Sequence, residues 1–131
     1  MRSVALTGIS PSVIDALRSG KPRTLELQSA HNVITVAHAA PGDMIFMTSV
    51  DMDDLSSGDA GILVQIVSLS ITMKRVVEFV QPALFEERER TSARIQVKFG
   101  CNSLVKEVET KDFGQPTTID VVKQQTCYRA G

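Results

Sequence analysis

GISPSVIDALRSGKPRTLELQS, at residues 8–29, reads as a capped helix, a basic glycine turn and a strand. Ser10 is predicted to cap the helix, because the backbone amides of the first turn have no partner within the helix. Pro11 suits the first helical position, because proline has no backbone amide hydrogen that would need a partner there. Apolar residues then recur on one helical face, and Gly20 supplies the left-handed stop. A helix this short is not stable alone, so its apolar face is expected to pack on a sheet.

The strand predicted after the turn carries polar side chains on one face. Within RTLELQ at residues 23–28, Thr24, Glu26 and Gln28 alternate with two leucines. Such donors and acceptors suit the edge of a nucleobase or a phosphate group. The alternative is the solvated face of an edge strand, which is the commoner origin of this pattern.

Most of the remaining chain is β-like. Strands are predicted at residues 3–7, 32–37, 44–50, 61–73 with an extension at 76–79, 94–99, 104–108 and 118–122. The apolar parity changes near Ile66, so we expect a bulge there that turns all the apolar residues of this strand to the core. A second, short surface helix is predicted at 82–90, where Glu86 and Arg90 have i,i+4 spacing. Residues 1–131 then form one domain of the α+β class, mostly β: a compact, partly closed β-barrel with a helix at its edge.

Composition narrows the class of protein. The chain has 131 residues, of which 43% are hydrophobic, without a run of 18 apolar residues or a secretory leader. Cys101 and Cys127 lack zinc-site spacing and fit reduced thiols. We therefore expect a cytoplasmic protein with no membrane contact.

Metal and cofactor sites are not predicted. The acidic loop at residues 51–61 lacks the glutamate that a calcium loop of the EF-hand type needs. His31 and His38 lie seven residues apart, on opposite faces of the strand predicted there. No phosphate-cradling or dinucleotide glycine motif occurs. Cys101 beside Asn102 is a candidate nucleophile only if a histidine approaches it, and a structural thiol is the simpler interpretation.

Charge is unevenly distributed although the formal net charge is only −1. Residues 1–25 hold four basic side chains and one acidic, whereas residues 26–73 hold six acidic side chains and no Lys or Arg. This pattern can steer an anionic ligand toward the first segment. Aromatic residues make up 5% of the chain, without Trp, which disfavours a stacking platform for single strands but leaves room for one or two nucleotides.

Residues 4–73 resemble the ASCH family, whose members are PUA-like β-barrels. The resemblance rests on the order GISPSVIDALRSGKPRTLELQS, PGDMIFMTSV and GILVQIVSLSI. Length and this order also resemble an archaeal family of small proteins, domain-of-unknown-function family 473. The PUA-like resemblance implies recognition of RNA or modified bases, and some ASCH members resemble hydrolases of acylated nucleosides.

The ASCH signature maps onto the glycine turn and the strand after it. Gly20, Thr24 and Glu26 match it, Arg23 replaces the usual lysine, and Gln28 replaces the usual arginine. The hydrolytic mechanism implied by the resemblance uses that lysine and a threonine where this chain has Glu26. Arginine stays protonated near neutral pH, so these departures weigh against that mechanism.

Three functions follow from these patterns. The leading hypothesis is a domain that binds RNA or a modified nucleotide in a pocket beside the Gly20 turn. Its ligand-binding residues are Arg18, Lys21 and Arg23 for phosphate, Thr24, Glu26 and Gln28 for a polar edge, and Thr48 and Ser49 at the end of the 44–50 strand. The first alternative is a hydrolase with Glu26 as general base, which leaves enzyme activity undecided. The second is a protein-interaction module that uses the acidic segment 43–59.

Overall fold

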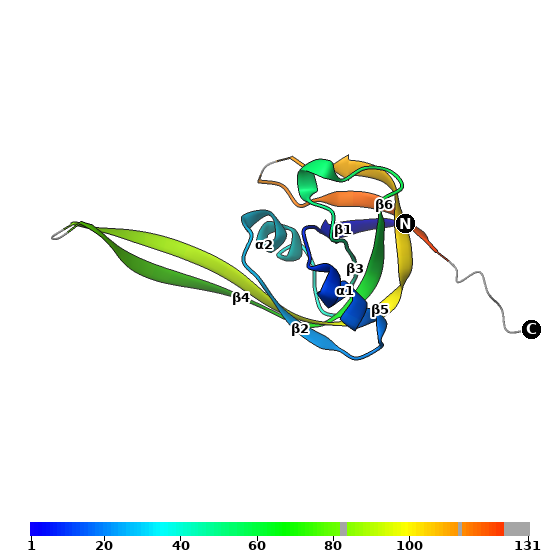
Figure 1. Ribbon diagram of the computed structural model, residues 1–131, viewed down its shortest axis with the longest axis horizontal. Helices are drawn as coiled ribbons and strands as arrows, with labels where there is room; N and C mark the ends of the chain where they lie inside the picture. The colour runs from blue at the N-terminus through cyan, green and yellow to red at the C-terminus, as the bar shows by residue number, and fades with distance from the viewer. Residues whose placement is uncertain (82–83, 113, 125–131) are drawn as a thin grey trace, which may run out of the picture.

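The computed structural model describes residues 1–81, 84–112 and 114–124, with side chains outside 73–90. Its elements are, in order, β1 (Arg2–Leu6), α1 (Pro11–Arg18), β2 (Arg23–Leu27), α2 (Ala30–Val36), β3 (Met44–Met47), the 3₁₀ turn η1 (Met52–Asp54), β4 (Ala60–Gln81), β5 (Leu84–Thr110) and β6 (Thr118–Lys123). Figure 1 shows two short helices against a sheet that makes up most of the molecule. The predicted class, α+β and mostly β, is confirmed.

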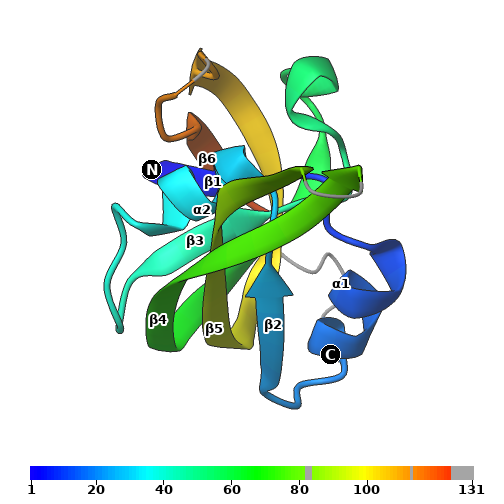
Figure 2. The same cartoon turned by 90° about the vertical axis from the view of Figure 1, so that its left-hand side faces the viewer.

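The sheet closes on itself. Its strand order is β2-β5-β4-β3-β1-β6, and β6 also pairs with β5, so five strands form a ring of backbone pairings. β1 and β3 run parallel, and the other pairings are antiparallel. Figure 2 shows β2 standing beside β5, with α1 to one side of the sheet. The ring encloses the core and holds β2 on its outer flank.

The organising stretch folds locally as the sequence predicts, with one difference at the cap. α1 begins at Pro11, and Gly20 follows it with a φ of +94°, in the region that favours glycine. The Ser10 hydroxyl, however, lies 2.8 Å from the hydroxyl of Ser12 and caps no amide. The carbonyl of Ser10 instead accepts the amides of Val13 and Ile14. Backbone bonds and the proline therefore start this helix without the side-chain cap.

β4 carries the predicted bulge, but its apolar residues do not all reach the core. The register against β5 shifts between Ile66 and Ser68, which confirms the bulge. Leu69 packs against the core, whereas Val67 and Ile71 remain 45% and 47% exposed. The expectation that all of them are buried is wrong, because the strand leaves the body of the molecule here.

Beyond this point β4 and β5 form a long two-stranded arm. We define the arm as residues 72–81 and 84–92; it projects away from the ring in Figure 1. The strand predicted at 76–79 is confirmed. The helix predicted at 82–90 is wrong from Leu84 onward, because that segment is strand, while 82–83 lie outside the described residues. Pairing with β4 overrides the local spacing of Glu86 and Arg90, which both helix and strand tolerate.

α2 replaces the strand predicted at residues 32–37. Its β-branched residues favour a strand locally, yet the helix turns Val33 and Val36 into the core. Because this segment is helical, His31 and His38 do not lie on opposite faces of one strand, as the sequence predicted. His31 lies within α2 and His38 just after it, where the ring Nδ1 lies 2.9 Å from the carbonyl oxygen of Ile34.

Two buried polar side chains of α2 anchor it to the sheet. The Asn32 amide donates to the carbonyl of Thr7 at 2.8 Å and its Oδ1 accepts the Thr7 amide at 3.0 Å. One turn later, the Thr35 hydroxyl accepts the amide of Thr117 at 3.0 Å. The Asn32 side chain therefore pairs with the backbone just after β1 as a neighbouring strand would.

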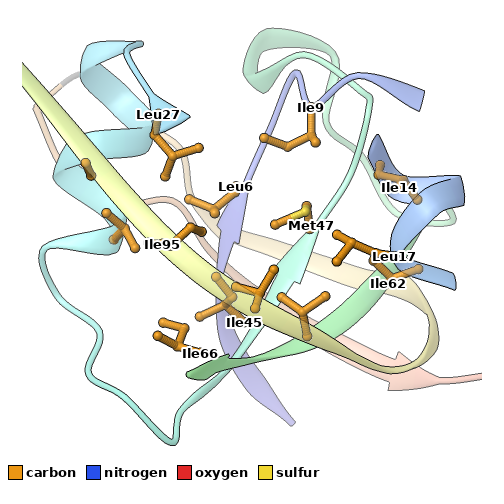
Figure 3. Packing of buried hydrophobic residues seen from close by; sticks show 14 of the residues in the cluster. Leu6, Ile9, Ile14, Leu17, Leu27, Ile45, Met47, Ile62, Ile66 and Ile95 are labelled. Atoms are coloured by element: carbon orange, nitrogen blue, oxygen red, sulfur yellow. The ribbon is translucent and has the colours of Figure 1, made fainter. Parts of the chain in front are cut away.

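The core lies inside the ring and beneath both helices. Apolar residues from α1, β1, β3, β4 and β5 converge in Figure 3, among them Leu6, Leu17, Met47, Ile62 and Ile95. A second cluster surrounds Phe46 on the other side of β3 and includes Leu63, Val105 and Ile119. The alternation predicted at 94–99 is confirmed, with Ile95 and Val97 fully buried. Among the described residues, no helix has the length and apolar character needed to cross a membrane.

Candidate functional site

The predicted site begins at the turn between α1 and β2. Gly20 donates its amide to the carbonyl of Leu17, and Pro22 directs the chain into β2. Arg18, Lys21 and Arg23 are all exposed around this turn. The sequence therefore places three cations on the surface at the C-terminal end of α1, where the helix dipole also favours positive charge.

Arg18 is held by neighbouring side chains. Its Nε donates to Oδ1 of Asn102 at 2.9 Å and its Nη1 to Oδ1 of Asp15 at 3.1 Å. These contacts fix the guanidinium between α1 and β5 and offset part of its charge. Lys21 and Arg23 are the more available cations for a phosphate.

The polar face of β2 is a solvent-exposed part of the sheet. Thr24 lies opposite Gln96 and Glu26 opposite Arg94, and all but the half-buried Gln96 are exposed. Arg23 has the parity of the two leucines, so it lies on the other face of β2 from Thr24 and Glu26. The nucleotide hypothesis places Arg23, Thr24 and Glu26 around one ligand, but the strand places Arg23 on the opposite face from the other two. Gln28 is exposed just beyond the strand.

Thr48 and Ser49 lie at the opposite end of α1 from the Gly20 turn. The carbonyl of Thr48 accepts the amide of Ile9, which precedes α1. Thr48 is fully buried, its hydroxyl donates to the carbonyl of Ala60 at 2.9 Å, and it accepts the amide of Val50. Eight helical residues, about 12 Å, separate the two ends. The structure therefore uses Thr48 to tie β3 to β4 and leaves Ser49 exposed away from the turn.

Two carboxylates of the acidic segment 43–59 accept hydrogen bonds from backbone amides within their own turns. Asp43 accepts the amide of Ala40 at 2.9 Å, and Asp59 accepts the amide of Ser56 at 2.8 Å. Asp51, Asp53 and Asp54 are exposed. Within the described residues, no group of three or more His, Cys, Asp or Glu side chains is arranged to hold a metal ion.

The predicted thiol nucleophile has a simple local environment. The Cys101 sulfur lies 3.8 Å from the hydroxyl of Ser103, and the neighbouring Asn102 is engaged by Arg18. Cys127 lies outside the described residues.

A cleft of about 640 Å³ opens elsewhere, between β1, β5 and β6. It is lined by Arg2, Ser3, Val4, Glu107, Val108, Glu109, Thr110 and Thr118. Arg2 forms an ion pair with Glu109 at 2.8 Å, and Glu107 adds negative charge. None of the predicted site residues lines this cleft, and no local motif marks it because its walls come from three distant segments.

One carboxyl group near this cleft has a shifted pKa. The amino group of Met1 donates to Asp120 at 2.7 Å, and this bond, together with the charge of Lys106, lowers the pKa of Asp120. The pair ties the start of β1 to β6.

Comparison with known proteins establishes the family. Residues 1–119 match the family model described as "Protein of unknown function (DUF473)". The chain belongs to this family. The chain is also similar to the "Uncharacterized protein MJ0105" of Methanocaldococcus jannaschii, 29% identical over 98 residues, which are 75% of this chain and 60% of that protein. The predicted resemblance to family 473 and to an archaeal protein is confirmed.

A solved structure shares the fold. The DUF473 chain is similar to the N-terminal domain of the Mycobacterium avium complex Lon protease, with a TM-score of 0.56 at 11% identity. The match covers 99% of this chain and 58% of that one. This chain therefore spans about three fifths of both proteins, and at this identity the second likeness concerns the fold alone. Membership of the ASCH family stays a prediction.

Proposed function

We propose that this protein is an interaction domain that binds a protein partner along β4. The observation that carries the proposal is the open edge of β4, which we define as residues 67–81. β3 pairs only with residues up to Gln65, and Ile66 bonds the loop at Gly42 and Asp43. From Val67 outward, the described residues place β5 on one side of β4 and no strand on the other.

An open edge of this length is a template for another strand. Its backbone amides and carbonyls are free to pair with an extended segment, as in complexes formed by strand addition. Fifteen residues at 3.3 Å each give an edge of about 50 Å. Val67 and Ile71 add exposed apolar surface at the base of the edge.

The arm itself needs further support. β2 pairs with β5 only as far as Ala93, which lies opposite Ile71, and beyond this pair the two strands have only each other among the described residues. A two-stranded hairpin alone is marginally stable in water, whereas three or more strands with an apolar face are stable. A bound strand would therefore stabilise the arm as well as recognise it.

The scaffold for this edge is, in our proposal, a partly closed barrel of the PUA-like kind. The closed ring of pairings and the likeness to the Lon N-terminal domain support it. The interaction class was one of the functions expected from sequence. The proposal moves its surface from the acidic segment to β4, because two of those aspartates already bond neighbouring amides.

A photocrosslinking amino acid tests the proposal at Ile71, with Val122 as the matched control. Both side chains are 47% exposed, but Val122 lies on β6, away from the arm. In cells that contain the protein, irradiation is expected to give discrete protein adducts from position 71 and at least fivefold less adduct from position 122. Equal yields, or none from position 71, would overturn the proposal.

Nucleotide binding is a second candidate, favoured by the cations at the Gly20 turn. Lys21 and Arg23 are exposed, and Lys98 of β5 is exposed nearby, opposite Gln65. The ligand supported by this surface is a phosphate backbone, because its exposed cations suit phosphate groups. The hydrolase alternative has weaker support, since the exposed Glu26 lacks the burial that makes a carboxylate an effective base.

Titration with a short structured RNA at 50 and 200 mM salt tests this candidate. Binding is expected to weaken roughly tenfold between the two, because neutralised phosphates release counterions. Replacing both Lys21 and Arg23 by Ala should reduce the salt slope by about two, while Lys123→Ala leaves it unchanged. Absence of binding at 50 mM salt excludes the candidate.

A further inference from the structure

Two positions of the arm lie opposite like charges in the hairpin register, whereas Arg75 lies opposite Glu89. In the backbone register, Lys74 lies opposite Arg90 and Glu78 lies opposite Glu86. Directly opposed like charges destabilise a two-stranded pair. The register of the hairpin thus contains a basic pair toward its base and an acidic pair toward its tip.

The sequence of β4 complements itself when reversed. An antiparallel pairing of two β4 strands centred on Val76 sets Lys74 of each chain opposite Glu78 of the other. The same register sets Met73 opposite Phe79 and Val76 opposite itself. In this register Lys74 and Glu78, each opposite a like charge within the hairpin, lie opposite an unlike charge of the second chain, while Val77 lies opposite Arg75.

The other edge of the arm complements itself only in part. The equivalent pairing of two β5 strands, centred on Arg88, sets Arg88 against itself and Glu87 against Glu89. The same register sets Glu86 opposite Arg90, so it opposes opposite charges there and like charges at its centre and at 87 and 89. The β4 register centred on Val76 contains no like-charge pair at 74–78 and is therefore the more favourable of the two.

We infer that the partner of β4 is a second copy of this chain, joined through an antiparallel β4–β4 pair with Val76 on the two-fold axis. The two arms then form a four-stranded sheet across the dimer. Such an interface is isologous, because each chain contributes the same surface, and it closes without leading to a fibre. The inference rests on the proposed function, since it names the occupant of the same edge.

Charge reversal tests the register through the oligomeric state of the purified protein. Sedimentation equilibrium is expected to show a dimer for the natural sequence. Lys74→Glu places Glu opposite Glu78 at two symmetric positions, and Glu78→Lys places Lys opposite Lys74, so each single change should weaken dimerisation tenfold or more. The double variant K74E/E78K restores opposite charges and should recover most of the affinity.

Loss of folding does not explain the expected result. Within one hairpin, Lys74→Glu sets Glu opposite Arg90, and Glu78→Lys sets Lys opposite Glu86, so either change removes a like-charge pair. The melting temperature of each variant monomer should stay level or rise while dimerisation falls. Lys123→Glu, an equal charge change on exposed β6, is the control and should leave the dimer intact.

A cysteine at position 76 gives an independent readout of the register. In a background with Cys101→Ser and Cys127→Ser, Val76→Cys should form a disulfide-linked dimer under mild oxidation, and Val122→Cys should not. A monomeric natural protein, a double variant no better than the singles, or equal crosslinking at both positions overturns the inference. If the purified protein is monomeric while position 71 still crosslinks to another protein in cells, the interaction domain stands and the second copy is excluded.

Discussion

Asn32→Ala is expected to lower the free energy of unfolding by about 3 kcal/mol, because removal of this side chain leaves two buried backbone groups of Thr7 unpaired. Asn32 is 5% exposed and Thr7 is 1% exposed, so water does not readily replace the lost partner. Each buried group left without a hydrogen bond costs roughly 1–3 kcal/mol. Urea unfolding followed by circular dichroism measures the change.

Asn102→Ala is the matched control for this effect. Asn102 also accepts one hydrogen bond, from Arg18, but at a half-exposed position. Its loss should cost less than about 1 kcal/mol, because solvent satisfies the guanidinium. Equal losses for the two variants would contradict the role given to Asn32 in joining α2 to β1.

Gly61→Ala is expected to cost about 2 kcal/mol through overpacking between β3 and β4. A Cβ atom at Gly61 would stand 2.5 Å from the carbonyl oxygen of Met47 and against the ring of Phe46. Neither group can move away easily, because the carbonyl oxygen of Met47 is part of the sheet backbone and the Phe46 side chain is fully buried.

The control on the same strand is Ser68→Ala, at an exposed position. It should change stability by less than about 0.5 kcal/mol. Thermal and urea unfolding of both variants give the comparison. A Gly61→Ala protein as stable as the natural one would show that β3 and β4 pack less closely than the structure indicates.

The elements that local chemistry determines were the predictable ones. α1, the Gly20 turn and β2 depend on a proline, a left-handed glycine and strict alternation, each readable within a few residues. The alternation from Arg94 to Phe99 likewise predicts which side chains face the core. These features fix the flank of the ring on which the predicted site lies.

The failures occurred where distant contacts override local preference. α2 is helical despite its β-branched residues, because the helix brings Asn32 to Thr7 and Thr35 to the segment before β6. The segment from Leu84 is a strand because β4 offers it a partner over its whole length. Neither partner can be recognised from a window of ten residues.

The candidate site was predicted only in part for the same reason. The cations of the glycine turn lie close together in sequence, and the structure keeps them together on the surface. Parity places Arg23 away from Thr24 and Glu26, and α1 separates Thr48 and Ser49 from the turn. The open edge of β4 emerges only when the sheet order is known, since an unpaired edge is a property of the assembled sheet.

The central claim is that the open edge of β4 is the functional surface, and the yield of photocrosslinked adducts tests it most directly. The measurement compares position 71 at the base of that edge with position 122, which is equally exposed on β6. The account predicts discrete protein adducts from position 71, at least fivefold above those from position 122. Adducts of equal yield at the two positions, or none at position 71, would contradict it.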